Sequence, residues 1–538
     1  MARFGLVKNP DEELYNSDEW AARRTAYADY LSWFRGDSIR DPESSISDPA
    51  TGDRPKLYPL ALNPIGKVCR VHRDVLIGIQ PHNVLSNPVQ IVVKPGGDSS
   101  TSRAEATSIQ DLLRSTWDDS EATALIQRVG LMTQVFGGYG LQVLWQPQDT
   151  ELATRLRIFP VTPGTLLPVY DKGQWWNLRE CYIGYLISSV DAARYGVKVD
   201  ENEDALYMEH WTPDSYVIRV NGKVAQVEGY GILEGPHPFK RVPIVYIPHI
   251  RDDGFWGNSH IPDLVGLTRE KNFRSADKGD AVREVTHPIM TVANVEKGLK
   301  MQPVLDEHGR EVSTALNLGV KRAAPNSGDP KADFLRYPEV PASLANYDAE
   351  LWNEIRRQAD IAAVALGDDD VSGGRITGPV TAYRMWPTMA HTQAERIDFS
   401  TAMRHLNRII LAGLMGYGNA LTQAGVTLPV NLSEDHLRLN QLLIWNPQIP
   451  LEVSERADML NNRLTKGGIS LLSYLTEIGV HDPEAEQDRI RADMEFENEL
   501  EIKRATAIAE SKPAPFGGGQ PSGNGQNAPV PVPAGVPK

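Results

Sequence analysis

Apolar residues recur at helical spacing in the first eighty residues of the chain. The spacing predicts a helix over residues 10–35 and a second helix over 61–80. Residues 36–56, between them, are rich in Asp, Ser, Pro and Gly and are predicted to form a loop. Residues 91–93 (Ile-Val-Val) are predicted to be a short strand. A further helix is expected to start with Asp118 or Asp119 as its N-cap and to end near Gly130 or Gly137.

From about residue 140 to 250 the pattern changes to the alternation typical of β-strands, for example over 141–145. The strongest local signal is Asn221-Gly222, which separates two alternating β-branched runs. A type I′ turn needs positive φ at both central residues, so Asn-Gly predicts a β-hairpin here. Residues 242–248 contain two prolines and are predicted to be an edge strand, because proline cannot donate to a strand ladder.

The second half of the chain alternates between long helices and short segments. A solvated, strongly charged helix is predicted over 262–285, short strands and turns over 287–340, and a helix over 344–366 that stops at Gly367. A long amphipathic helix is predicted over 381–415. Its apolar residues are expected to form one stripe: Ala382, Met385, Trp386, Met389, Ile397, Met403, Leu406, Ile410 and Leu414.

Composition indicates a globular protein with more than one core. A chain of 538 residues exceeds the length at which a single core keeps growing, so two to four subdomains are expected. Cys69 and Cys181 are too few for a disulfide framework or a four-cysteine metal site, and we expect buried thiols in a reducing cytoplasm. No run of 18 apolar residues is present, so no membrane association is expected, and the first residues do not resemble a signal peptide.

The net charge of −15 bears on nucleic-acid binding. A protein that grips DNA by neutralising phosphates is normally basic, so the charge argues against ordinary high-affinity DNA binding. It is compatible with a wide channel whose walls repel a sliding duplex, and equally with a role in solubility alone.

Motifs of known chemistry are incomplete, so we expect no catalytic residues, no cofactor and no metal site. The phosphate-binding loop of ATPases is missing. His72-Arg73-Asp74 mimics a kinase catalytic loop but has Ile79 where the metal-binding Asn should be, and is interpreted as part of a helix face. Asp368 begins half of a calcium-binding loop, which fails at its twelfth position, Pro379.

Four histidines of the β-rich region lack metal-ligand spacing, and each is interpreted as a structural or surface residue: His210, His237, His249 and His260.

The order of motifs in the last third is the most informative feature. Residues 444–450 (Ile-Trp-Asn-Pro-Gln-Ile-Pro) are followed by 466–470 (Lys-Gly-Gly-Ile-Ser), by 482–486 (Asp-Pro-Glu-Ala-Glu) and by a highly charged helix. This order resembles the C-terminal part of portal proteins, the DNA-packaging rings of tailed double-stranded-DNA bacteriophages. The resemblance extends over roughly residues 10–510 and is strongest from 262 onwards.

The resemblance implies an α+β portal fold with a wing, a stem, a clip and a helical crown, assembled as a cyclic ring. The expected boundaries are an N-terminal wing region with an enlarged β-rich part at 1–260, a descending stem helix at 261–286, the clip at 287–340, a returning stem helix at 341–366, a tunnel loop at 367–380, a long wing helix with the wing's completion at 381–450, the crown at 451–511 and a disordered Pro/Gly-rich tail at 512–538.

Two groups of site residues follow from the resemblance. The tunnel loop, expected to project into the channel, contains Asp368, Asp369, Asp370, Ser372, Gly373, Gly374 and Arg375. The basic residues of the descending helix could face the channel or form salt bridges instead, and these are Arg269, Lys271, Arg274 and Lys278.

The resemblance also implies a mechanical function. We expect a homo-oligomeric ring, of twelve subunits as in the family, at one capsid vertex of a virion assembled in the host cytoplasm. Double-stranded DNA would be packaged and ejected through its channel. Partners would be the large terminase, the major capsid and scaffold proteins, and later neck or adaptor proteins. The alternatives are a carboxylate-dependent carbohydrate hydrolase and another virion structural protein.

Overall fold

The structure is a computed structural model. It describes residues 9–39, 61–78, 88–97, 99–171, 173, 176–227, 231–251, 254–286, 290–293, 302–305, 311–315, 323–326, 331–334, 342–367, 378–446, 448, 453–477 and 483–510. The chain divides into two compact units, Met1–Leu451 and Glu452–Lys538. Helices and strands are mixed along the chain, which confirms the α+β class.

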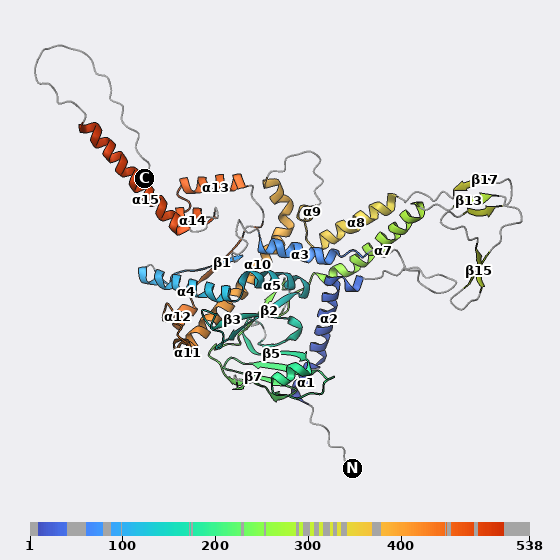
Figure 1. Ribbon diagram of the computed structural model, residues 1–538, viewed down its shortest axis with the longest axis horizontal. Helices are drawn as coiled ribbons and strands as arrows, with labels where there is room; N and C mark the ends of the chain where they lie inside the picture. The colour runs from blue at the N-terminus through green and yellow to red at the C-terminus, as the bar shows by residue number, and fades with distance from the viewer. Residues whose placement is uncertain are drawn as a thin grey trace, which may run out of the picture. The chain divides into compact units, whose positions relative to one another are not determined.

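The first unit contains most of the helices and all the described strands (Figure 1). Its helices are α1 (Pro10–Tyr15), α2 (Asp18–Arg35), α3 (Pro64–Ile77), α4 (Ser100–Asp119), α5 (Ala122–Phe136), α6 (Ser189–Arg194), α7 (Ile261–Thr286), α8 (Ala342–Gln358), α9 (Ala363–Leu366), α10 (Gly378–Gly416), α11 (Gly418–Gln423) and α12 (Glu434–Leu437), with 3-10 turns at Asp37–Ile39 and Pro163–Thr165. Its strands are β1 (Val89–Val93), β2 (Gly138–Trp145), β3 (Leu156–Val161), β4 (Leu166–Tyr170), β5 (Leu178–Ile187), β6 (Ala205–Trp211), β7 (Ser215–Val220), β8 (Lys223–Val224), β9 (Gln226–Val227), β10 (Gly231–Ile232), β11 (Glu234–Pro236), β12 (Ile244–Pro248), β13 (Met290–Ala293), β14 (Gln302–Leu305), β15 (Glu311–Ala315), β16 (Ala323–Asn326), β17 (Lys331–Phe334) and β18 (Gln441–Trp445).

In the β-rich middle β9 and β10 pair with each other as a two-stranded sheet, and the other strands form two larger antiparallel sheets. One has the strand order β11-β7-β6-β5-β4 with β8 beside β7, and the other has the order β12-β2-β3. The predicted hairpin is confirmed, since β7 and β8 pair across Asn221 and Gly222, whose φ angles are 48° and 76°. The predicted edge strand is also confirmed, because β12 pairs with β2 on one side and ends its sheet.

The prediction that Asp118 or Asp119 caps a following helix is wrong. Both aspartates end α4, a helix the sequence analysis did not identify, and α5 starts after Glu121, which adopts φ +56°. Asp119 instead accepts a hydrogen bond from the backbone N–H of Ala153 at 2.8 Å. The helical spacing of the apolar residues of α4 would have revealed it, and the buried ones are Ala106, Ile109, Leu112, Leu113 and Trp117.

Two predicted helices are interrupted. The helix expected over 10–35 breaks at Asn16 and Ser17 into α1 and α2. The helix expected over 344–366 breaks after α8, where Asp360 adopts φ +51°, and resumes as α9 before ending at Gly367 as predicted. Thr388 of α10 holds this break in place, because its hydroxyl donates to Asp360 O at 2.9 Å and accepts from Ala362 N at 2.8 Å.

The single apolar stripe predicted for α10 is wrong in part. Met403 and Leu406 are buried as expected, but Trp386 and Ile397 are 66% and 60% exposed. The buried side of the first half carries polar residues such as Thr392 instead. Apolar residues lie on both sides of this helix, so spacing alone could not show which side packs.

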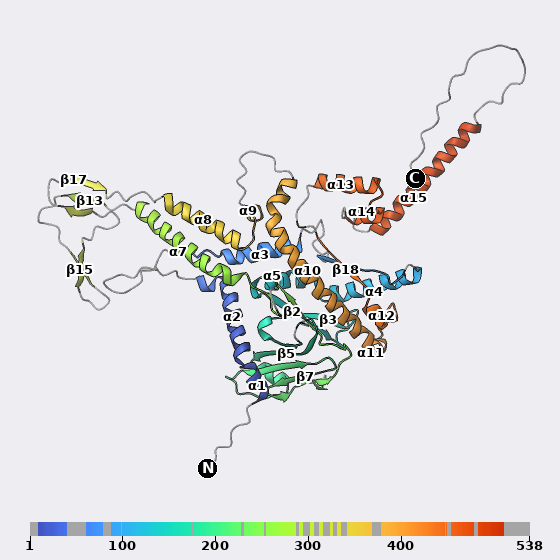
Figure 2. The same ribbon diagram turned by 180° about the vertical axis from the view of Figure 1, so that it is seen from behind.

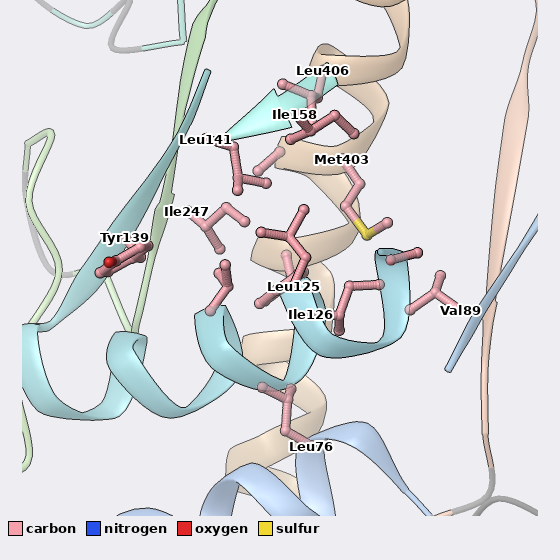
Figure 3. Close-up of a cluster of buried hydrophobic side chains, with 14 of the residues drawn as sticks. Leu76, Val89, Leu125, Ile126, Tyr139, Leu141, Ile158, Ile247, Met403 and Leu406 are labelled. Atoms are coloured by element: carbon pink, nitrogen blue, oxygen red, sulfur yellow. The ribbon is translucent and has the colours of Figure 1, made fainter. Parts of the chain in front are cut away.

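The main core of the first unit lies between α3, α5, α10 and the strands β2 and β3. Figure 3 shows side chains from these elements pointing toward one another. Its fully or nearly fully buried members include Leu76, Leu125, Ile126, Leu141, Met403 and Leu406. α10 therefore lies at the centre of this core and packs against the elements around it.

Helices α7 and α8 lie side by side and run in opposite directions, with the strands β13–β17 between them in sequence (Figures 1 and 2). The expectation that α7 is simply a solvated helix is wrong for one face. Leu264, Thr268, Asn272 and Ala276 are buried there, because α7 packs against α8 and against α2 and α3.

The second unit contains three described helices: α13 (Val453–Thr465), α14 (Leu471–Glu477) and α15 (Pro483–Glu510). α14 contacts both α13 and α15. Ser470 caps α14 by accepting from the backbone N–H of Ser473 at 3.1 Å, and Gly467 adopts φ +70° in the turn before it. The tail predicted to be disordered, 512–538, lies outside the described residues.

Candidate functional site

The four basic residues for which a channel-facing and a salt-bridging role were both left open lie on α7. Lys271 is turned into the hairpin, where its Nζ contacts Asp348 Oδ1 of α8 at 2.5 Å, and the two side chains are only 12% and 18% exposed. Lys278 Nζ lies 3.9 Å from the other oxygen of Asp348 and is 42% exposed. Ser275 donates a third contact to this carboxylate at 3.3 Å. Asp348 therefore links three positions on α7 to α8.

The two arginines of this group have other partners. Arg274 donates to Glu270 at 2.8 Å and to Asp277 at 3.0 Å on its own helix, and the hydrogen bond to Glu270 raises the pKa of Arg274. The Arg269 guanidinium lies 5.0 Å from the ring centre of Trp33 on α2. The side chains of Arg274 and Lys278 are 38% and 42% exposed, and Arg269 is exposed as well.

The predicted tunnel loop lies outside the described residues. The structure describes the chain up to Gly367 and again from Gly378, so it tests neither the loop at 368–375 nor the calcium-like pattern within it.

A second group of polar residues, which the sequence analysis treated as unrelated, meets in the interior. His391 and Glu395 lie one turn apart on α10, His72 lies on α3, His249 follows β12, and His260 precedes α7. All five side chains are buried or nearly so. The imidazole rings of His72 and His260 stack at 4.5 Å, and those of His260 and His391 at 5.0 Å. We call these five residues the histidine cluster.

Hydrogen bonds orient the histidine cluster around Glu395. Its Oε1 contacts His249 Nε2 at 2.8 Å and His391 Nε2 at 3.0 Å. Its Oε2 accepts from Gln134 Nε2 of α5 at 2.9 Å. One donor atom each from His72, His260, His391 and Glu395 lies within 4.8 Å of the other three, so these four could hold a metal ion.

Burial and mutual charge set the protonation of the histidine cluster. Burial lowers the pKa of His72 to about 4, and burial lowers the pKa of His260 well below its usual range. Burial raises the pKa of Glu395, but the charges and hydrogen bonds of His249 and His391 outweigh it and hold that pKa well below its usual range. Burial also lowers the pKa of His391, but Glu395 raises it overall. At neutral pH His72 and His260 are therefore neutral, the form that binds metals.

A third polar region lies on the second half of α10. Arg404 and Arg408 lie on this helix near Arg241, and burial together with these three positive charges lowers the pKa of His405 to about 4. A cavity of about 110 Å³ is lined by Arg404, His405, Arg408 and residues preceding β18. Positive charge is thus concentrated locally on a chain whose net charge is −15.

Similarity to known proteins does not decide between these regions. Comparison with protein-family models and with curated proteins gave no match to this chain. Among the described residues, no helix is both long enough and apolar enough to cross a membrane.

The histidine cluster could be foreseen only in part. His391 and Glu395 have the i, i+4 spacing that puts two ligands on one helix face, and this signal was present in the sequence. His72, His249 and His260 come from three other segments, so only the packing of α3, β12 and α7 around α10 brings them together. His249 and His260 are both buried, and their spacing in the sequence did not indicate that they meet.

Proposed function

We propose that this chain is the subunit of a phage portal ring at one capsid vertex, through which double-stranded DNA is packaged and later ejected. The observation that carries the proposal is the order of elements: α7 and α8 pack as an antiparallel pair, short strands lie between them in sequence, and the 39-residue α10 follows. This is the order in which a portal stem, clip and long wing helix occur.

Contacts between α7 and α8 support the assignment of this pair as the stem. One largely buried ion pair joins the two helices, since Lys271 of α7 contacts Asp348 of α8, and Ser275 of α7 donates to the same carboxylate. Asn272, near the middle of α7, joins the pair to the segment before α3, accepting from Leu62 N at 2.7 Å and donating to Leu62 O at 3.0 Å. Such bonds would keep the α7–α8 pair from bending when DNA moves past. ATP hydrolysis would come from a separate terminase.

An exposed apolar stripe on α10 supports assembly into a ring. Tyr383, Trp386 and Ile397 are 84%, 66% and 60% exposed, and their spacing puts them on one side of the helix. Exposed apolar stripes of this kind mark protein–protein contacts. Repeated contact of this surface with a different surface of the next copy closes into a ring when the rotation permits.

The hydrolase alternative needs two carboxylates open to a substrate. In the six-stranded sheet, Glu209 does not have this property. It is buried, and its oxygens accept hydrogen bonds from Gln142 at 3.0 Å, Tyr207 at 2.9 Å and Trp211 at 2.7 Å. A carboxylate satisfied in this way stabilises the sheet.

The tunnel-loop part of the proposal can be tested by deletion. A chain lacking residues 368–375 is expected to assemble rings of normal mass but to package less DNA into empty capsids with the terminase, measured as nuclease-protected DNA. The control carries a deletion of equal length, 521–528, in the C-terminal tail and is expected to package normally. Normal packaging by the 368–375 deletion would refute the loop assignment.

A further inference from the structure

Four side chains of the histidine cluster bring together atoms that can bind a metal ion, and their burial in one place needs an explanation. Three imidazoles, from His72, His260 and His391, and the Glu395 carboxylate bring one donor atom each within 4.8 Å of one another. Burying several imidazoles around one carboxylate removes all of them from water, at a cost that is recovered only if each polar atom finds a partner.

Two ring nitrogens of the histidine cluster have no hydrogen-bond partner in the part of the chain that the structure describes. His72 Nδ1 and His260 Nε2 are buried and make no hydrogen bond among the described residues. Both side chains have less than a tenth of their surface exposed. Buried nitrogens without a partner are rare, and a bound ion is one of the few explanations for them.

The outer hydrogen bonds of the cluster match those of a metal site. His72 Nε2 contacts the backbone oxygen of Ala359 at 2.6 Å, so its Nδ1 is left to point elsewhere. His391 Nδ1 contacts Asp360 Oδ2 at 3.1 Å, which leaves its Nε2 directed toward Glu395. Metal-binding histidines characteristically donate their second ring N–H to a carbonyl or a carboxylate, which fixes the ring and its tautomer.

We propose that His72, His260, His391 and Glu395 bind one Zn²⁺ ion. Three imidazole nitrogens and one carboxylate oxygen form the four-ligand tetrahedral set that zinc prefers. Bonds of about 2.0–2.2 Å place such ligands roughly 3.4 Å apart, so the side chains need to close in by small rotations about their χ angles. His249, bonded to Asn258 O at 2.5 Å and to Glu395 Oε1 at 2.8 Å, holds the carboxylate in place.

The position of this site indicates a structural rather than a catalytic role. The four ligands are buried and come from three separate segments: α3, the residue before α7, and α10. A closed site with four protein ligands leaves no open position for a substrate. Bound zinc would tie the start of α7 to the middle of α10, and so fix the base of the α7–α8 pair.

Metal analysis of the full-length protein tests the proposal, after purification without chelator and removal of any histidine tag. We expect one zinc per chain. After removal of zinc, Co²⁺ should bind with the intense visible absorption of a tetrahedral site, without thiolate bands. His260→Gln should weaken zinc binding at least tenfold, as loss of even an outer group commonly does. His237→Gln is the matched control, because His237 is also buried and also has a ring nitrogen without a partner, but lies outside the cluster.

Stoichiometric zinc that is lost in His260→Gln and kept in His237→Gln supports the proposal. Folded, metal-free protein that binds neither Zn²⁺ nor Co²⁺ at micromolar concentrations overturns it, as does a weak octahedral Co²⁺ spectrum. If His260→Gln fails to fold, the Co²⁺ spectrum of the unmutated chain decides. None of these outcomes depends on whether the chain forms a ring.

Discussion

The substitution Gly413→Ala tests whether α10 packs as closely on the core as the structure indicates. A Cβ added at this position would lie 2.4 Å from Cε1 and 2.8 Å from Cδ1 of Phe239, and 3.4 Å from Leu156 Cδ1. Phe239 is 1% exposed, so its ring has little free space to enter. Gly413→Ala should therefore force the helix and the ring apart.

The size of the effect follows from two opposing contributions. Carbon atoms in contact lie about 3.5–4.0 Å apart, so the new methyl group is more than 1 Å too close, and overpacking of this kind costs roughly 1–3 kcal/mol. Alanine has an advantage of about 1 kcal/mol over glycine within a helix. Because the clash is with a buried ring, we place the overpacking cost at the upper end and expect a net destabilisation of about 2 kcal/mol.

Gly266→Ala is the matched control. Gly266 lies within α7, is exposed, and has no atom within 4 Å of an added Cβ. It should gain the helical advantage of about 1 kcal/mol without a clash. Urea unfolding followed by circular dichroism compares the stability of the two variants. Their midpoints can be compared directly when the dependence of the unfolding free energy on urea concentration is unchanged.

A second substitution identifies the source of the loss. Phe239→Leu removes the ring that Gly413→Ala meets, so the double variant should be more stable than the sum of the single effects predicts. A Gly413→Ala protein as stable as the unmutated chain, or strictly additive effects in the double variant, would refute the packing described here.

Two further predictions concern charge. Asp348→Asn leaves Lys271, which is 12% exposed, without its carboxylate partner. It should destabilise the α7–α8 pair by roughly 2 kcal/mol, less than the 3–5 kcal/mol expected for a fully buried ion pair. Amide hydrogen exchange should become faster in α7 and α8, and the control Glu350→Gln, at an exposed neighbouring position, should leave the exchange rates unchanged. Burial lowers the pKa of His405 to about 4, so between that value and the usual pKa near 6.5 the unfolded chain binds a proton that the folded chain does not. Stability should consequently fall as the pH drops from about 6.5 to 4, and His405→Gln should reduce that loss; an equal loss in the variant would contradict the assignment.

The sequence predicted well those features that depend on neighbouring residues. Asn221-Gly222 specified a turn because both residues tolerate positive φ, and Gly367 ended a helix for the same reason. The prolines of 242–248 placed a strand at a sheet edge. In each case the deciding physics lies within a few residues of the chain.

Features set by packing between distant segments could not be predicted in the same way. The side of α10 that carries Trp386 is apolar enough to be core, and only the arrangement of α3, α5 and β2 shows that it is not. The break after α8 depends on Thr388, a residue of α10. The histidine cluster likewise needs four segments to meet, and the i, i+4 pair of His391 and Glu395 alone did not indicate it.

The portal proposal requires that the chain assembles into a ring with an axial opening. The most direct measurement is single-particle electron microscopy of the purified full-length protein, with mass photometry at several salt concentrations. Twelve chains of 59.6 kDa give about 715 kDa, so we expect rings close to that mass with an opening wide enough for duplex DNA. A monodisperse monomer or dimer at every salt concentration would contradict the portal proposal.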